Sequence, residues 1–370
     1  MDCRICGERA ELILDLGYQP FANALLDRQD EQQSVYPLKF YYCDSCQYGM
    51  TDNLSSTNIF DDTYPYYSSV NTSYVKQCKE WATKYKKEHN PQRVIEIGSN
   101  DGYMLENFKD SSHLGFEPSR GPFQVSEDKN LNVVNDFFNG VAEKADLIIA
   151  NNVLAHTPKL MTMIGDIALS LSNHGQAVIE FPTLENLILH TQYDTIYHEH
   201  FSYFTLHSMV KALNSHKLYL HYFEEIPSHG GSIRAYFSKQ EDMSENINRS
   251  NMDIQGFAQR VKLSKLNNLR TILLAKSYKY KLALFGAAAK GNTFLNYLGI
   301  GYDMFDFCVD ETKYKQGKFL PGSRIPIVGM EELMLRKPEV LWILPWNFKE
   351  EIIKKCSFIG GWDGIFEVKQ

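Results

Sequence analysis

The first 75 residues contain few basic side chains, with four Lys and Arg against eleven Asp and Glu. This acidity argues against nucleic-acid binding there, because phosphate backbones are bound by basic surfaces. No apolar run approaches the ~18 residues that a membrane span requires, and no signal peptide is evident at the N-terminus. We therefore expect a cytoplasmic protein with no nucleic-acid partner and no membrane partner.

The chain also lacks the composition of a disordered or fibrous protein. Its 370 residues are 44% hydrophobic and 22% charged, which is ordinary for folded proteins. At about 100–200 residues per domain, this length predicts two or three domains. No repeated apolar heptad marks a dimer stripe, so we expect a monomer.

Four of the seven cysteines form two Cys-x-x-Cys pairs, Cys3 with Cys6 and Cys43 with Cys46. Each pair bends the chain so that two thiolates point at one cation, as in tetrahedral zinc sites. Four thiolates leave no position for water, so the expected zinc is structural. Two disulfides are the rival interpretation, disfavoured by the three lone cysteines and the missing signal peptide. The local acidity disfavours a nucleic-acid finger.

Between residues 76 and about 240, apolar runs alternate with helical patterns, as in the βαβ units of a parallel sheet. The last two runs are nearly adjacent and predict an antiparallel edge. The predicted strands are Arg93–Ile97, His113–Phe116, Leu131–Val134, Asp146–Ala150, Gln176–Phe181, Leu218–Phe223 and Ser232–Phe237. We therefore expect a mostly parallel α/β sheet.

The first predicted strand runs into the turn Gly98-Ser-Asn-Asp-Gly102 and then into a helix expected to start near Tyr103. Glycines let a ligand approach the backbone at the carboxyl ends of parallel strands. The turn is not GxGxxG and lacks the Lys of a phosphate loop, so a dinucleotide or nucleoside triphosphate fits poorly. Glu96 before the turn is typical of Rossmann-like S-adenosylmethionine-dependent methyltransferases.

Polar residues follow the later strands in the order that an adenosyl site requires. Glu117 lies about 20 residues after the glycine turn, where a carboxylate binds ribose hydroxyls. Asp136 is placed for an adenine amino group. The predicted cofactor-binding residues are Tyr66, Ser69, Glu96, Gly98, Asn100, Asp101, Glu117, Pro118, Asp136, Phe137 and Asn151.

The aromatic segment Tyr64-Pro-Tyr-Tyr-Ser-Ser69 follows the second cysteine pair. Consecutive tyrosines are bulky and costly to expose. The segment is either a packed linker or a lid over the ligand of the next domain. As a lid, Tyr64 and Tyr66 would shield the sulfonium of the methyl donor by cation–π contact.

Two histidine-bearing segments are candidates for chemistry. His156 follows the fourth strand, and it is either an ordinary exposed side chain or a group that faces substrate. The second segment is Tyr197-His198-Glu199-His200. It admits a metal-binding His-x-His, a structural filler, or acid–base machinery. We favour acid–base chemistry, because histidine titrates near neutral pH and a neighbouring carboxylate raises its basicity.

Helical spacing over residues 241–281 predicts a long linking helix. The sequence Gly286-Ala-Ala-Ala-Lys290 then follows an apolar strand and opens another helix, whose N-terminus offers N–H donors to a phosphate. Met304–Val309 and Val340–Leu344 are further predicted strands. This second, smaller α/β unit is either a structural cap or a platform for a nucleotide sugar. A separate NAD site is disfavoured, because the glycine pattern is incomplete and no acidic ribose partner is evident.

In this order the motifs resemble those of sugar C-methyltransferases that act at C3 of nucleotide-linked 4-keto deoxyhexoses, as in mycarose- and tetronitrose-type pathways. The resemblance spans nearly the whole chain, from the paired cysteines through His229-Gly-Gly231 to Gly286–Gly291. It implies a zinc module with a lid, a class I Rossmann-like methyltransferase domain and a Rossmann-like C-terminal domain. The expected boundaries are 1–75, 76–240, a helical linker at 241–281, and 282–370.

The resemblance further implies deprotonation at C3 beside the 4-ketone and attack of the resulting carbanion on the donor methyl. The expected base is His200, tuned or anchored by Glu199. The expected catalytic residues are His200, Glu199, Tyr197, His156 and Tyr64, and the expected substrate-binding residues are His229, Arg234, Lys290 and Asn292. The segment from His229 to Arg234 is alternatively a plain hairpin. Methylation of oxygen or nitrogen on a related sugar, and a non-catalytic zinc-braced binding module, are the rival functions.

Overall fold

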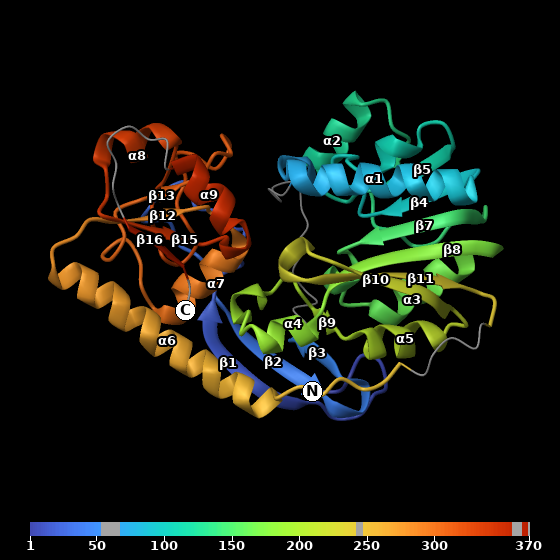
Figure 1. Ribbon diagram of the computed structural model, residues 1–370, viewed down its shortest axis with the longest axis horizontal. Helices are drawn as coiled ribbons and strands as arrows, with labels where there is room; N and C mark the ends of the chain where they lie inside the picture. Colours follow the sequence, from blue (N-terminus) through green and yellow to red (C-terminus); the bar gives the residue numbers. More distant parts are fainter. Residues whose placement is uncertain (53–66, 242–246, 357–364, 369–370) are drawn as a thin grey trace. The chain divides into compact units, whose positions relative to one another are not determined.

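The computed structural model describes residues 1–52, 67–241, 247–356 and 365–368, which form two compact units (Figure 1). The first unit comprises Met1–Glu11, Tyr42–Asn186 and His200–Asn251, and the second comprises Leu12–Tyr41, Leu187–Glu199 and Met252–Gln370. Each unit is therefore assembled from separate stretches of the chain. The predicted lid residues Tyr64 and Tyr66 lie outside the described residues.

A seven-stranded sheet forms the centre of the first unit (Figure 1). Its strands are β4 (Arg93–Ile97), β5 (Ser112–Phe116), β6 (Val133–Val134), β7 (Ala145–Asn151), β8 (Leu171–Pro182), β10 (Tyr219–Ile226) and β11 (Ser232–Ser238). The strand order is β10-β11-β8-β7-β4-β5-β6. Each strand overlaps one of the seven predicted runs, so the α/β fold expected for this part of the chain is confirmed.

Helices accompany the strands of this sheet. Those between residues 72 and 214 are α1 (Thr72–His89), α2 (Arg120–Asp128), α3 (Leu160–Ser170), α4 (Leu184–Leu189) and α5 (Leu206–Asn214). Helix α1 places Tyr74, Trp81 and Tyr85 in one apolar cluster with Val94 of β4 and Leu147 of β7. Burial of these large side chains holds α1 against the sheet.

The expected antiparallel edge is confirmed. Strand β11 is antiparallel to both β8 and β10, and β10 is the outermost strand. All seven residues of β11 are buried, whereas only one residue of β10 is buried. The inner place therefore goes to the strand that can be covered on both faces.

The helix expected near Tyr103 is corrected. A short 3₁₀ helix, η3 (Leu105–Phe108), follows the glycine turn instead. Tyr103, Met104 and Leu105 are consecutive and all buried. The side-chain amide of Asn107 bonds the carbonyls of Tyr103 and Met104, and such local side-chain bonds to the backbone compete with regular helix.

The N-terminal part of the chain contains β1 (Glu11–Gln19), β2 (Tyr36–Cys43) and β3 (Tyr48–Thr51). A further strand, β9 (Ser202–Phe204), comes from the segment after His200. Within the first unit, β3 pairs antiparallel with β9, so that Gly49 lies opposite Tyr203. This pairing joins the segment after the second cysteine pair to the segment after His200.

The second unit contains a five-stranded sheet in which every pairing is parallel. Its strands are β12 (Leu282–Phe285), β13 (Cys308–Val309), β14 (Ile327–Val328), β15 (Val340–Ile343) and β16 (Ile365–Val368), in the order β14-β13-β12-β15-β16. The remaining helices are α6 (Ile254–Ser277), α7 (Ala289–Leu298), α8 (Met330–Arg336) and α9 (Lys349–Cys356). The predicted second α/β sheet is confirmed.

One predicted strand of this sheet is too long. Only Cys308 and Val309 of the expected run from Met304 pair in the sheet. The amides of Met304 and Phe305 donate to the carbonyl of Gly301 instead, which makes a turn there. None of the described helices, including the 24-residue α6, is long and apolar enough to cross a membrane.

Candidate active site and zinc centre

The four paired cysteines converge in the first unit. The sulfur atoms of Cys3, Cys6, Cys43 and Cys46 all lie within 4.8 Å of one another, and those of Cys6 and Cys43 are 3.7 Å apart. Tetrahedral zinc with bonds of about 2.3 Å places its sulfur ligands about 3.8 Å apart. The arrangement fits one tetrahedral ion, and the separation is too long for a disulfide of about 2.05 Å.

A cation is needed to make the most buried of these sulfurs thiolates. Burial raises the pKa of the Cys43 thiol to about 12, and a coordinated cation removes that proton. Across the part of the chain that the structure describes, no other group of three or more metal-ligating side chains was found. The metal-binding interpretation of His198 and His200 therefore gains no third ligand.

The glycine turn after β4 packs closely against the segment that follows β7. Gly98 has a φ of +64°, and a Cβ there would lie 2.7 Å from Cγ2 of Val153, so only glycine fits without strain. The carboxylate of Glu117, directly after β5, accepts hydrogen bonds from the amides of Asn100 at 3.0 Å and Ser119 at 2.8 Å. One acidic side chain thus orders the turn and the start of α2, and its burial raises its pKa.

Several polar side chains near this turn are buried and have atoms without a hydrogen-bond partner among the described residues. They include Glu96, Ser99 through Oγ, Asp101 through Oδ1, and Asn151 through both amide atoms, with exposures of 1%, 0%, 0% and 7%. Burial raises the pKa of Glu96 well above its usual range. An unpaired buried polar group costs about 1–3 kcal/mol, so such a cluster at neighbouring strand ends fits a polar ligand.

The other predicted cofactor residues lie around the same turn. The backbone amides of Ser68 and Ser69 donate to the side chains of Asn100 at 2.8 Å and Asp101 at 3.2 Å. Asp136 is exposed and accepts the amide of Phe137 at 2.7 Å, and Phe137 itself is 49% exposed. Pro118 is half-buried after β5.

The structure brings two of the predicted catalytic histidines together. The ring centroids of His156 and His200 are 4.7 Å apart, and both side chains are half-buried. His156 ends the 3₁₀ helix η4 (Leu154–His156), which follows β7. The amide of Phe201 donates to the carbonyl of Ala155 at 2.7 Å, and the ring of Tyr203 lies 6.0 Å from that of His200. Two imidazoles thus meet at the carboxyl end of β7.

The residues just before His200 belong to the second unit. Glu199 is fully buried, and its Oε1 accepts hydrogen bonds from the amide of Asn23 at 3.2 Å and its side chain at 3.1 Å. His198 packs edge-on against Phe21 and lies 3.2 Å from the carbonyl of Pro37. His198 therefore has a structural role. The tuning of His200 by Glu199 stays a prediction, as does the role of the half-buried Tyr197.

Arg234 is part of a buried ionic network in the sheet. It lies directly opposite Glu180 in the pairing of β11 with β8 and contacts its carboxylate at 3.0 Å and that of Glu224 at 3.3 Å. It also lies over the ring of Trp81 at 5.0 Å. The contacts described for Arg234 are all with other side chains of the sheet and of α1. His229 lies in η6 (Ser228–Gly230), and its side chain is outside the described residues.

Lys290 lies in the first turn of α7 in the second unit. Its ammonium donates to the side chain of Asn347 at 2.8 Å and lies over the ring of Trp346 at 4.5 Å. The indole of Trp346 in turn donates to Asp194 at 2.7 Å. Asn292 is 1% exposed, and its amide donates to the carbonyl of Ala22 at 2.6 Å, so this side chain fastens two chain segments together.

The C-terminal glycine turn does have an acidic partner, contrary to expectation. Gly286 has a φ of +87°, and a Cβ there would lie 2.5 Å from Pro345. The amide of Ala287 donates to Asp310 at 2.7 Å, much as the Asn100 amide does to Glu117 in the first unit. Asp310 directly follows β13, the end of the strand predicted over Met304–Val309.

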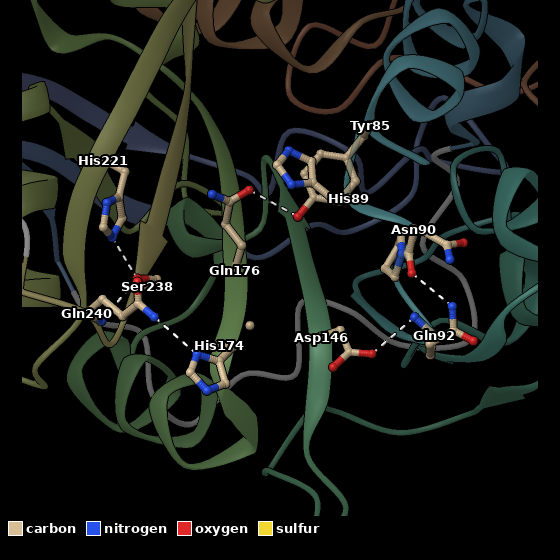
Figure 2. A pocket seen from close by; sticks show the side chains of 12 residues that line it. Tyr85, His89, Asn90, Gln92, Asp146, His174, Gln176, His221, Ser238 and Gln240 are labelled. Carbon is tan, nitrogen blue, oxygen red and sulfur yellow. Dashed lines mark hydrogen bonds between the residues drawn. The ribbon is translucent and has the colours of Figure 1, made fainter. Parts of the chain in front are cut away.

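A polar cavity of about 450 Å³ lies elsewhere in the first unit (Figure 2). Its lining includes His89, Gln92, Asp146, His174 and His221. These residues lie near the amino ends of β4, β7 and β8, whereas the predicted cofactor residues follow the carboxyl ends of the parallel strands. The cavity is therefore separate from the candidate active site.

Comparisons with known proteins agree with this architecture. Three family models match in succession: a zinc-binding domain over residues 3–60, a methyltransferase domain over residues 73–221 and a C-methyltransferase C-terminal domain over residues 227–369. The C-methyltransferase NovU of Streptomyces niveus is 28% identical over 385 aligned residues, covering 95% of this chain and 91% of NovU. These findings identify an S-adenosylmethionine-dependent C-methyltransferase. It uses S-adenosylmethionine and carries zinc on its four paired cysteines.

Solved structures are similar over less than half of this C-methyltransferase. An S-adenosylmethionine-dependent methyltransferase from Clostridium acetobutylicum is 12% identical, with coverage of 44% of this chain and 91% of that chain and a TM-score of 0.39. Magnesium protoporphyrin IX methyltransferase from Synechocystis is 12% identical, with coverage of 46% and 84% and a TM-score of 0.39. Similarity at this level says nothing about substrate.

Sequence reasoning missed several residues of this C-methyltransferase that shape the site. Arg4 and Thr51 bond to the backbone around His200, Glu180 pairs with Arg234, and Asp310 orders the second glycine turn. The first three act across 54 to 197 residues of sequence. No local pattern signals contacts of that range, whereas Asp310 at least follows an apolar segment.

Proposed function

We propose that this C-methyltransferase methylates C3 of a nucleotide-linked 4-keto deoxysugar, with His200 as the general base. The observation that carries the proposal is the pair of half-buried imidazoles of His156 and His200, with ring centroids 4.7 Å apart. They lie at the carboxyl end of the sheet, where α/β proteins bind ligands. The order of motifs along the chain supports a keto sugar as the substrate.

We propose that the cluster of polar groups around the first glycine turn is the binding site for S-adenosylmethionine. S-adenosylmethionine supplies an electrophilic methyl group. Glu117 would bind the ribose hydroxyls, and Asp136 with Phe137 would bind adenine. The unpaired atoms of Glu96, Asp101 and Asn151 would form hydrogen bonds with the polar groups of S-adenosylmethionine. The proposed contacts among the described residues are Ser69, Glu96, Gly98, Asn100, Asp101, Glu117, Pro118, Asp136, Phe137 and Asn151.

Carbon becomes nucleophilic only after it loses a proton beside the ketone. In the proposed reaction the neutral imidazole of His200 takes the proton from C3, and the C–H electron pair delocalises onto the ketone as an enolate. His156 donates a hydrogen bond to the oxygen that gains negative charge. Such a bond accelerates the reaction because it is stronger to the enolate than to the ketone. The C3–methyl bond then forms as the sulfur–methyl bond breaks.

The second unit is the proposed platform for the nucleotide. Lys290 lies in the first turn of α7, where a cation and the N–H groups of a helix N-terminus both favour a phosphate. Its ammonium contacts the side chain of Asn347 and the ring of Trp346. In this proposal residues 282–370 bind the nucleotide, residues 76–240 bind the methyl donor, and residues 1–75 support the site through zinc.

The cofactor assignment predicts a loss of affinity when Glu117 is changed to Gln. The carboxylate accepts hydrogen bonds from two backbone N–H groups. In glutamine an NH₂ group replaces one of the oxygens, so that one backbone N–H then faces a second donor and loses its acceptor. We expect the Kd for S-adenosylmethionine to rise at least tenfold, or about 1.4 kcal/mol, by isothermal titration calorimetry. Glu127→Gln on the exposed face of α2 is the control, with an unchanged Kd. An unchanged Kd in Glu117→Gln contradicts the assignment.

Methyl transfer to a panel of 4-keto nucleotide sugars tests the proposed function directly. The panel varies the base of the nucleotide and the hydroxyls of the sugar, with isotopically labelled S-adenosylmethionine as donor. We expect one product that carries the label on C3, located by NMR. Label on oxygen or nitrogen would overturn carbon methylation of these sugars. Binding of S-adenosylmethionine without transfer to any panel member would place the substrate outside keto sugars.

A further inference from the structure

The side chain of Arg4 connects the zinc site to the segment that carries His200. Arg4 lies between the zinc ligands Cys3 and Cys6. Its guanidinium donates one hydrogen bond to the carbonyl of Phe201 at 2.6 Å and another to the carbonyl of Thr51 at 2.8 Å. The group also lies 6.0 Å from the ring of Phe201. All these residues belong to the first unit.

Thr51 adds two bonds to the same stretch of backbone. Its hydroxyl donates to the carbonyl of His200 at 2.8 Å, and its amide donates to the carbonyl of Phe201 at 3.3 Å. The ladder continues where β3 pairs with β9, and Tyr48 and Ser202 share a hydrogen bond of 2.5 Å between their hydroxyls. The backbone of His200 and Phe201 is thus fixed from the zinc side.

The opposite side of this backbone is fixed to the His156 segment. The amide of Phe201 donates to the carbonyl of Ala155 at 2.7 Å, and His156 is the next residue. Phe201 therefore receives Arg4 and Thr51 at its carbonyl and bonds the His156 segment through its amide. The spacing of the two imidazoles therefore depends on where the backbone of Phe201 lies.

We infer that Arg4 is a positioning residue for the His156–His200 pair, and that zinc keeps Arg4 in place. Charged donors make the stronger hydrogen bonds, and the planar guanidinium reaches two acceptors at fixed angles. A general base must lie within about 3 Å of the proton it takes, and a displacement of about 1 Å costs on the order of 10²-fold in rate. The catalytic consequence rests on the proposed role of His200.

This link gives the zinc module a connection to catalysis that does not involve the predicted lid. The two zinc-binding knuckles are fixed differently: Arg4 of the first contacts Phe201, whereas the second receives a bond from Lys211 of α5 to the carbonyl of Ser45 at 3.0 Å. Lys211 is therefore a matched control. It is a cation that joins the zinc module to the same unit but forms no described bond to residues 200–203.

The test compares Arg4→Ala, Arg4→Lys and Lys211→Ala in the full-length, zinc-loaded enzyme. We expect Arg4→Ala to lower kcat about 10- to 100-fold, with the KM for S-adenosylmethionine within twofold of wild type and zinc content unchanged. Arg4→Lys should recover part of the loss, because one donor can still reach a carbonyl. Lys211→Ala should keep kcat within twofold. A wild-type kcat in Arg4→Ala overturns the inference.

A readout without substrate separates this inference from the proposed function. The ring resonances of His200 are assigned by NMR with His200→Asn, and we expect Arg4→Ala to shift them and leave those of the remote His89 unchanged. If Arg4→Ala moves the His200 signals while His200→Asn is fully active, positioning stands and the base assignment fails. Unmoved His200 signals in a folded, zinc-loaded Arg4→Ala overturn positioning.

A second variant covers the case in which Arg4→Ala loses zinc. Thr51→Val keeps Arg4, the side-chain volume and the β-branched shape, but removes the hydroxyl that donates to the His200 carbonyl. We expect a several-fold fall in kcat with an unchanged KM for S-adenosylmethionine and a shift of the His200 resonances. If Thr51→Val changes neither kcat nor the His200 signals, the zinc-side contacts do not position the histidine pair.

Discussion

Changing His200 to Asn should lower kcat by about 10²–10⁴-fold, the usual contribution of a general base. Asparagine keeps a polar side chain of similar reach but cannot take a proton at neutral pH. The backbone contacts of His200 to Thr51 remain, so we expect unchanged zinc content and an unchanged Kd for S-adenosylmethionine. The measurement is single-turnover methyl transfer under saturating donor, which isolates the chemical step.

Two further histidine variants sharpen this result. His156→Asn should cost less than His200→Asn, because an asparagine amide still donates a hydrogen bond to the enolate oxygen. His89→Asn, in the cavity near the amino ends of the strands, should leave kcat unchanged. Near-normal turnover in His200→Asn would contradict the base assignment, and a larger loss in His156→Asn would exchange the two roles.

Changing Cys46 to Ser should abolish zinc binding and activity together. Cys46 is fully buried within the four-sulfur cluster. Structural zinc contributes about 10–16 kcal/mol of apparent binding free energy to small domains, which rivals the 5–15 kcal/mol total stability of a typical protein. We expect less than one tenth of the wild-type zinc content by metal analysis, a lowered Tm and turnover below detection.

The control for this variant is Cys308→Ala in the second unit. Cys308 is also fully buried but lies on β13, outside the zinc cluster. Its removal creates a small cavity that costs some stability, while zinc content and kcat should stay within twofold of wild type. Wild-type turnover in a Cys46→Ser enzyme shown to contain no zinc would contradict a role of the metal in supporting the active site.

Local patterns sufficed to predict the strands of the large sheet and the cysteine cluster. The apolar runs of β4, β7 and β8 are long enough to be recognised without tertiary information. The zinc ligands are recognisable because the spacing within each Cys-x-x-Cys pair is enough to bring its two sulfurs to one cation. Strand β13 shows the limit of this reasoning, because only two of its residues pair in the sheet and the rest of the apolar run turns back to Gly301.

The site divides in the same way. His156 and His200 were placed together because both follow strand ends at one edge of a parallel sheet. The sequence leaves the segment from His229 to Arg234 open between a substrate contact and a plain hairpin. The partner of Arg234, Glu180, is 54 residues away and lies opposite it only after β11 enters the sheet. Removing one partner of such a buried ion pair costs about 3–5 kcal/mol, so Arg234 contributes to the fold, and its contact with substrate stays a prediction.

Arg4 illustrates a different limit. In the sequence it is one of two residues between a pair of zinc ligands, where side-chain identity has no bearing on the metal. Its contact with Phe201 spans 197 residues and forms only when the knuckle is folded and β3 has paired with β9. A contact of this range leaves no local pattern in the sequence.

Solvent deuterium exchange at C3 of a 4-keto nucleotide sugar tests the central claim most directly. The enzyme is incubated in D₂O with the sugar and with S-adenosylhomocysteine, which occupies the donor site but has no methyl to give. NMR then follows the C3 proton for wild type and for His200→Asn. The account predicts deuterium uptake at C3 with wild type and a loss of at least 10²-fold in His200→Asn. No exchange with wild type, or equal exchange with both enzymes, would contradict it.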